Sequence, residues 1–219
     1  MKKDDARRRR QRFCPACVRP LRALVGAMHF FLCLLPATAH AHGDFHERIV
    51  HLTWEITRDP RNAASHLQRG EIHRLYCAWR AAQRDYDHAA QLDPTLMDVD
   101  LARGKLLLEA RRPQAAKTAL DRFLRQRPGH PEALLTRARA LVKLRQPAAA
   151  ARDFTQVIDR VADPAPDLYL ERAQAQVATG PAALADAVRG LDEGIAHLGP
   201  LVTLQQQAGE LEARLRRYD

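Results

Sequence analysis

The stretch that decides the fold is residues 63–94, AASHLQRGEIHRLYCAWRAAQRDYDHAAQLDP. Alanine, leucine and arginine are abundant along the whole chain, which favours helices over strands. Asp93-Pro94 ends the second half of this stretch, because the residue before a proline avoids the α conformation. Gly70 lies inside the first half, where a helical glycine costs up to about 1 kcal/mol relative to alanine. The glycine therefore implies that a partner helix approaches closely.

The pattern of this stretch returns along the chain at a period of 34 residues. The prolines that close each unit are 34, 34, 36 and 36 residues apart, at Pro60, Pro94, Pro128, Pro164 and Pro200. Other series step by 34, namely Leu67, Leu101 and Leu135; Ala82, Ala116 and Ala150; and Pro113, Pro147 and Pro181. We expect the last series to occupy the first turn of each second helix, where a missing N–H removes no hydrogen bond. A period of 34 predicts stacked helix-turn-helix units.

These residues resemble the tetratricopeptide repeat family. At the family's spacing stand Gly70, Ala82, Tyr86, Ala89, Leu92 and Pro94. The resemblance covers about residues 60–219 and implies an all-α, right-handed solenoid of helical hairpins with about four and a half repeats. The expected units are 61–94, 95–128, 129–164, 165–200 and a partial unit, 201–219. The fourth unit is out of register by one to three residues, so its loops are expected to differ.

Small residues are expected where the two helices of a hairpin meet. These repeat-packing positions are Gly70, Ala82, Gly104, Ala116, Ala138, Ala150 and Ala173. A one-sided apolar helix within residues 42–60 is expected to cap the front of the array, and the apolar stripe of 201–215 its back. Arg217-Tyr218-Asp219 resembles the opening of another second helix, which favours an array that continues.

Residues 1–41 have the three parts of a secretory signal: a basic stretch, an uncharged apolar run over 23–35, and an A-x-A cleavage site ending at Ala41. The run is too short for a spanning helix of about 20 residues, so no stable membrane span is expected after cleavage. An uncleaved anchor is the alternative. The composition suggests a bacterial periplasmic or secreted protein. Cys77 is the one cysteine outside this leader, and we expect it to be a small buried apolar residue.

The net charge of +9 belongs mostly to the leader, which contains nine Lys and Arg but only two Asp. The remaining chain is close to neutral and gives no electrostatic reason to bind nucleic acid. Motifs of nucleotide-binding, hydrolase and zinc-protease sites are absent from the sequence, so we expect no enzyme activity and no cofactor. A series of arginines, Arg69, Arg103, Arg137 and Arg172, either pairs with carboxylates on adjacent helices or forms a strip for an acidic ligand.

The family resemblance implies that the first helix of each hairpin lines a concave groove. The residues three before and one after the small position then face that groove, namely Leu67, Glu71, Leu101, Lys105, Leu135, Arg139, Leu170 and Gln174. An apolar series edged by charge suits a protein or peptide partner. The alternative for the four leucines is that they fill the seam between hairpins.

The expected function is an exported, non-catalytic scaffold that binds a protein or peptide. One alternative is copper binding by His42 and His46, because an amine and imidazole nitrogens suit Cu(II) after cleavage at Ala41. A second alternative is a docking arm for an enzyme whose catalytic residues lie beyond Asp219.

Overall fold

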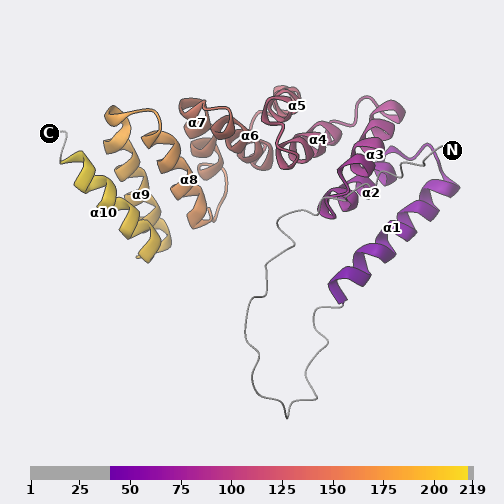
Figure 1. The fold of residues 1–219 in the computed structure, drawn as a ribbon, viewed down its shortest axis with the longest axis horizontal. Coiled ribbons are helices and arrows are strands. Elements are labelled where there is room, and N and C mark those ends of the chain that lie inside the picture. The colour runs from indigo at the N-terminus through magenta and orange to yellow at the C-terminus, as the bar shows by residue number, and fades with distance from the viewer. Residues whose placement is uncertain (1–39, 217–219) are drawn as a thin grey trace, which may run out of the picture.

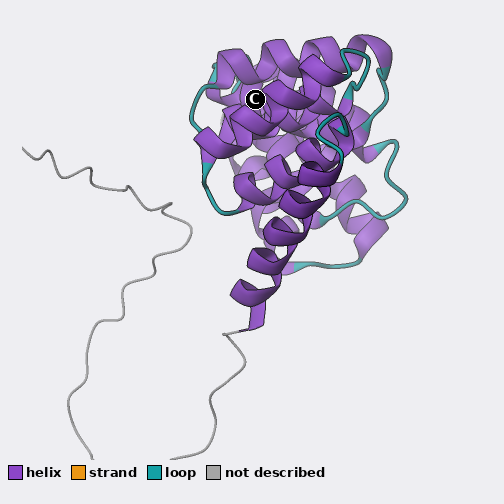
Figure 2. Cartoon of the chain, turned by 90° about the vertical axis from the view of Figure 1, so that its right-hand side faces the viewer, coloured by secondary structure: helices purple, strands orange, loops and turns teal. Residues whose placement is uncertain are grey.

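The computed structural model describes residues 40–216, which form helices and turns without a strand, as Figure 2 shows. The helices are α1 (His40–Arg58), α2 (Ala63–Leu75), α3 (Trp79–Leu92), α4 (Asp98–Glu109), α5 (Pro113–Gln126), α6 (Pro131–Lys143), α7 (Pro147–Ile158), α8 (Pro166–Val177), α9 (Leu184–Leu198) and α10 (Val202–Leu215). A short 3-10 turn, η2 (Pro181–Ala183), precedes α9. This architecture confirms the predicted all-α solenoid of hairpins.

Each helix packs mainly against its neighbours in the chain, so the array is elongated (Figure 1). Helices α2 and α3, α4 and α5, α6 and α7, and α8 and α9 form four antiparallel hairpins. We call the first helix of each hairpin helix A and the second helix B. Helix α1 packs against α2 at one end, and α10 packs against α9 and α8 at the other.

The turn inside each of the first three hairpins has the same backbone conformation. Cys77, Arg111 and Arg145 stand 34 residues apart and have φ values of 56°, 57° and 56°. The following amide closes the turn in each case, as in the 2.9 Å bond from the Ala78 N–H to the His73 carbonyl. A side chain in this left-handed region costs roughly 1 to 2 kcal/mol, which glycine would avoid. Cys77, expected to be a buried apolar residue, is instead half-exposed in this turn.

Prolines open several helices, although not all of them where the sequence predicts. Pro113 and Pro147 are the first residues of α5 and α7, as expected. Pro181 opens the 3-10 turn η2 instead of a helix B, and α9 begins only at Leu184. Gly180 precedes this turn with a φ of 128° and a ψ of 176°, a conformation accessible essentially only to glycine.

Close contact between helices A and B depends on small residues. A Cβ added to Gly70 would lie 2.5 Å from Cε1 of Tyr86, and one added to Gly104 would lie 2.6 Å from Cδ2 of Leu120. All seven predicted repeat-packing residues are buried: Gly70, Ala82, Gly104, Ala116, Ala138, Ala150 and Ala173. The two helices of each of the first two hairpins therefore touch where only glycine fits.

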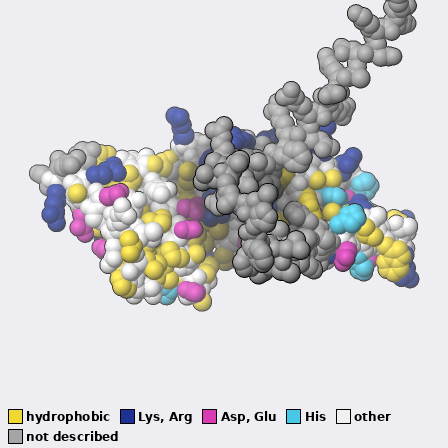
Figure 3. Space-filling model, turned by 60° about the horizontal axis from the view of Figure 1, so that its bottom comes forward, with side chains coloured by type: hydrophobic (Ala, Val, Ile, Leu, Met, Phe, Trp, Pro, Cys, Tyr) yellow, Lys and Arg dark blue, Asp and Glu magenta, His cyan; other side chains and the backbone are white. Residues whose placement is uncertain are grey.

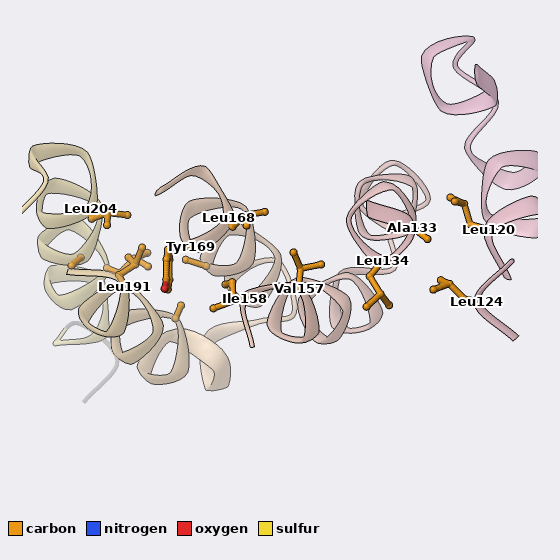
Figure 4. Close-up of a cluster of buried hydrophobic side chains, with 14 of the residues drawn as sticks. Leu120, Leu124, Ala133, Leu134, Val157, Ile158, Leu168, Tyr169, Leu191 and Leu204 are labelled. Carbon is orange, nitrogen blue, oxygen red and sulfur yellow. The ribbon is translucent and has the colours of Figure 1, made fainter. Parts of the chain in front are cut away.

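The apolar core runs along the array instead of collecting at one centre. Figure 4 shows one cluster in which Leu120, Leu134 and Leu191 belong to three successive hairpins. Because each hairpin contributes to a core shared with its neighbours, the burial of apolar surface depends on stacking.

The two ends are covered by single helices. In α1, Leu52 is buried, and in α10 the buried residues are Leu204, Ala208 and Leu211. The predicted leader lies outside the described residues except for its last two, since α1 begins at His40, just before the predicted cleavage site. Residues 217–219 also lie outside them. Among the helices of residues 40–216, none is long and apolar enough to cross a bilayer.

Candidate functional site

The four leucines predicted for the groove lie at the seams between hairpins. Leu101 is buried, with 7% of its surface exposed. Leu67, Leu135 and Leu170 are partly buried and pack against the core clusters. Their surface is therefore occupied largely by the protein's own side chains.

Three of the four polar groove residues form ion pairs, and these pairs either connect successive helices A or belong to a network that does. Arg74 binds both Glu71 of α2 and Glu109 of α4. Lys105 of α4 lies 2.5 Å from Glu132, the second residue of α6. Arg139 of α6 lies 2.7 Å from Glu171 of α8. Gln174 is exposed on α8. The polar edge of the predicted groove is thus also a set of bridges between hairpins.

The bridge at Glu71 is held by hydrogen bonds. Burial alone would raise the pKa of Glu71, but hydrogen bonds from Arg74 and Tyr86 outweigh it and lower the pKa. Burial and the hydroxyl's bond to Glu71 raise the pKa of Tyr86. Glu71 is therefore a fixed carboxylate that accepts from two donors, and a ligand would have to displace one of them.

All four arginines of the predicted series bind groups within the protein, and we call them the arginine ladder: Arg69, Arg103, Arg137 and Arg172. Arg69 donates to Asp85 at 2.7 and 3.0 Å, and Arg137 donates to Asp153 at 2.7 and 2.8 Å, each within its own hairpin. The remaining contacts join Arg103 to Asp87, Arg137 to Asp121, and Arg172 to Glu193. The side chain of Asp153 is only 5% exposed and pairs with Arg137. Pairing with carboxylates on adjacent helices is the alternative that the structure favours over an acidic-ligand strip.

An open pocket of about 660 Å³ lies between α6, α7 and α8. Its lining residues come from five segments, namely Leu108, Arg139, Val142, Lys143, Arg145, Pro147, Phe154, Glu171, Gln174, Ala175 and Ala178. Most of the lining is apolar, and Val142 is 44% exposed although it is a large aliphatic residue. This volume falls within the range of about 300 to 1,000 Å³ that is usual for ligand pockets.

The pocket lies at the break in the repeat register. Residues 127–130 join α5 to α6, whereas the longer segment 159–165 joins α7 to α8. Helix α4 packs against α6, but α8 packs mainly against α7 and α9. The pair of Arg139 and Glu171 connects α6 and α8 where the pocket separates them. The extra loop residues thus account for a gap between two helices A that the regular units lack.

The rim of the pocket carries a positive excess. The lining contains three cations but a single carboxylate: Arg139, Lys143 and Arg145 against Glu171. The hydrogen bond to Glu171 raises the pKa of Arg139. Neither Lys143 nor Arg145 has an ion pair within residues 40–216. The pocket therefore combines an apolar floor with two uncompensated cations, which suits an apolar group flanked by negative charge.

Of the eight predicted groove residues, only Arg139 and Gln174 line this pocket. Leu67, Glu71, Leu101, Lys105, Leu135 and Leu170 lie elsewhere along the array. The pocket residues that the sequence missed include Val142, Lys143 and Phe154. The signal that could have located them is the interval of 36 residues between Pro128 and Pro164.

Histidine side chains gather at the end of the array that holds α1 to α3, as Figure 3 shows in cyan. His42 lies in α1, but its side chain is outside the described residues, and His46 is exposed. No group of three or more potential metal ligands occurs in the part of the chain that the structure describes.

Comparison with known proteins supports the repeat assignment. Residues 101–141 and 135–193 match the sequence profile of the tetratricopeptide repeat family. A search of curated proteins finds no match. The similarity to solved structures lies in the fold, because the sequence identities are low.

Three solved structures illustrate this similarity. The chain shares 16% identity with YrrB, described as a tetratricopeptide repeat protein with an unusual peptide-binding site, at a TM-score of 0.61, covering 78% of this chain and 86% of YrrB. MamA of Desulfovibrio magneticus shares 15% identity at a TM-score of 0.59, with coverage of 80% and 89%. A thermophilic repeat protein of Thermus thermophilus shares 11% identity at 0.55, with coverage of 80% and 93%.

Proposed function

The chain folds as a tetratricopeptide-type solenoid, and we propose that it is an exported, non-catalytic adaptor. It binds a peptide segment of another protein in the pocket between α6 and α8. The tripartite leader supports export. Solenoids of this family generally serve as scaffolds for protein interaction. A relative of the same fold, YrrB, is described as having a peptide-binding site, which supports a peptide as the ligand class.

The observation that carries this proposal is the apolar pocket at the register break. Val142, Ala175 and Ala178 give its walls, and Phe154 lies at its base. An apolar side chain of a peptide would replace water against these groups, at about 25 cal/mol for each Å² of apolar surface removed from water. Such an anchor is the usual centre of a peptide interface.

The charges of the rim define the flanks of the peptide. Lys143 and Arg145 have no carboxylate partner, so they favour Asp or Glu beside the apolar anchor. The partner segment is therefore an extended peptide with one aliphatic or aromatic residue next to acidic residues.

Selection of peptides from a random displayed library, followed by calorimetric titration, tests this proposal. Val142→Asp places a carboxylate in the pocket at an exposed position, so the fold is retained. Val202→Asp is the matched control, because Val202 is 74% exposed at the start of α10, away from the pocket. We expect selected peptides to carry an apolar residue beside acidic ones, and Val142→Asp to weaken them by roughly tenfold or more, about 1.4 kcal/mol.

The control should bind as the parent does, and both variants should keep the helical circular dichroism of the parent. Selected peptides that bind parent and Val142→Asp equally well would overturn the proposed site. A library that yields no binder would overturn the proposed function.

A further inference from the structure

A second pocket, of about 420 Å³, lies between α3 and α4, far along the array from the first. Its lining is Trp79, Arg80, Gln83, Arg84, Leu106, Leu107, Ala110 and Arg112. It shares no residue with the pocket at α6 to α8. Its floor is apolar, since Leu106 is buried and Leu107 and Ala110 are partly buried. The proposed peptide-binding function does not account for this site.

Trp79 distinguishes this pocket from the corresponding places in other units. It stands 34 residues before Pro113 and 68 before Pro147, so an indole replaces the proline that opens α5 and α7. The indole Nε1 of Trp79 is buried and has no hydrogen-bond partner. Buried polar groups are nearly always hydrogen-bonded, so this donor is available to an acceptor, and the side chain of Trp79 lines the pocket.

Three arginines surround the same space, and none is neutralised. The side chains of Arg80, Arg84 and Arg112 form neither an ion pair nor a hydrogen bond within residues 40–216. The lining contains no Asp or Glu. The arginines of the ladder, by contrast, are held by carboxylates, as Arg69 is by Asp85. Three positive charges around an apolar floor produce a local potential that attracts anions.

Gln83 adds a polar group that is already partly engaged. Its Nε2 donates to Asp87 at 2.8 Å, and that carboxylate also accepts from Arg103. Asp87 therefore accepts from donors other than the pocket arginines. The carboxylates nearest to those arginines in sequence, Asp85 and Glu109, pair with Arg69 and Arg74 instead.

We propose that this pocket binds an oxyanion, either a carboxylate or a phosphate ester, carried on a compact apolar body. The apolar body packs on Leu106, Leu107 and Ala110. The guanidinium groups of Arg80, Arg84 and Arg112 bind the oxyanion, whose geometry matches their paired N–H groups. The indole N–H of Trp79 donates to an oxygen of the ligand. The volume suits one small molecule or one terminal residue of a chain.

Trp79 provides the measurement, because the chain has only two tryptophans. Replacing the exposed Trp54 by Phe in the full chain leaves Trp79 as the sole indole. Its fluorescence is then titrated with three probes: 4-phenylbutyrate, phenyl phosphate, and the neutral 4-phenylbutyramide. The first two distinguish a carboxylate source from a phosphate source, and the amide keeps the apolar body without the charge.

In this Trp54→Phe background, the test variant is Arg84→Gln with Arg112→Gln. The matched control is Arg152→Gln, since Arg152 stands two repeats after Arg84, is exposed and lines neither pocket. We expect one of the anionic probes to change the Trp79 emission saturably, with a Kd that rises roughly tenfold or more in the double variant. The control should change it less than about twofold, and the amide should not bind.

Three outcomes would each overturn the proposal. The first is unchanged Trp79 emission up to about 10 mM of both anionic probes, which corresponds to less than about 3 kcal/mol of binding free energy. The second is equal binding of the amide and the carboxylate. The third is equal loss of affinity in the double variant and the Arg152→Gln control.

Discussion

The contact of Gly70 with Tyr86 gives the sharpest test of how the hairpins are held together. A Cβ at Gly70 would lie 2.5 and 2.7 Å from two ring carbons of Tyr86 and 3.2 Å from Cβ of Asp85. Tyr86 is fully buried, and its hydroxyl is bonded to Glu71, so the ring cannot move without breaking that bond. Gly70→Ala would gain about 1 kcal/mol of helix propensity. Overpacking of this kind typically costs 1 to 3 kcal/mol, and the rigidity of the ring indicates the upper end, roughly 3 kcal/mol.

We therefore expect Gly70→Ala to lose about 1 to 2 kcal/mol of unfolding free energy, and Gly70→Leu to lose more. A loss of that size lowers the melting temperature by roughly 2 to 8 °C for a domain of this length. Gly209→Ala is the control, because Gly209 lies in α10 with no atom within 4 Å of an added Cβ. That variant should gain about 0.5 to 1 kcal/mol from propensity alone. Urea unfolding followed by circular dichroism measures both, and a Gly70→Ala variant at least as stable as the parent would refute the close approach.

Three further predictions concern the ladder, the histidines and the seam. Arg137→Met leaves the charge of Asp153 buried without a partner and should cost about 3 to 5 kcal/mol in urea unfolding, whereas Arg152→Met should be nearly neutral. Burial lowers the pKa of His73 below 6.5. The nearby charge of Asp85 raises this pKa and the charges of Arg69 and Arg84 lower it, so the fold on balance favours the neutral imidazole. The contribution of His73 to stability is complete above pH 6.5 and is lost as the pH falls through the lowered pKa. The urea midpoint of His73→Gln should therefore depend less on pH over that range than the midpoint of the parent. Leu101→Ser removes a buried seam residue and should cost about 2 to 5 kcal/mol, and a variant of parental stability would contradict the seam assignment.

The regular part of the fold could be predicted from sequence because each repeated residue type has one physical reason. Glycine or alanine at the helix crossing, proline at the first turn of helix B and a proline after it recur at 34 residues, and the hairpins follow. The turns are different. Cys77, Arg111 and Arg145 adopt a left-handed conformation that their side chains disfavour, so the turn is imposed by the packing of the hairpin and leaves no glycine to identify it.

The candidate site was harder to predict because it depends on where the repeat fails. Counting from the small position selects Arg139 and Gln174, which do line the pocket, but also Leu101, which is buried in a seam. The count assumes that successive helices A are equally spaced. Between α6 and α8 they are not, and residues outside the series, such as Val142, become accessible there.

The ion pairs along helices A explain why an irregular unit is the natural place for a ligand. In the regular units, Arg74 and Lys105 connect adjacent helices A, and the leucines beneath them fill the seam. A ligand that binds on that surface must break an ion pair and buries little apolar surface. At α8 the longer loop separates the helices while Arg139 still reaches Glu171, so apolar surface is exposed beside a bridge that is already present. A ligand at this position gains burial without disrupting the packing that holds the array, which is why we assign recognition to the break in the repeat and stability to its regular units.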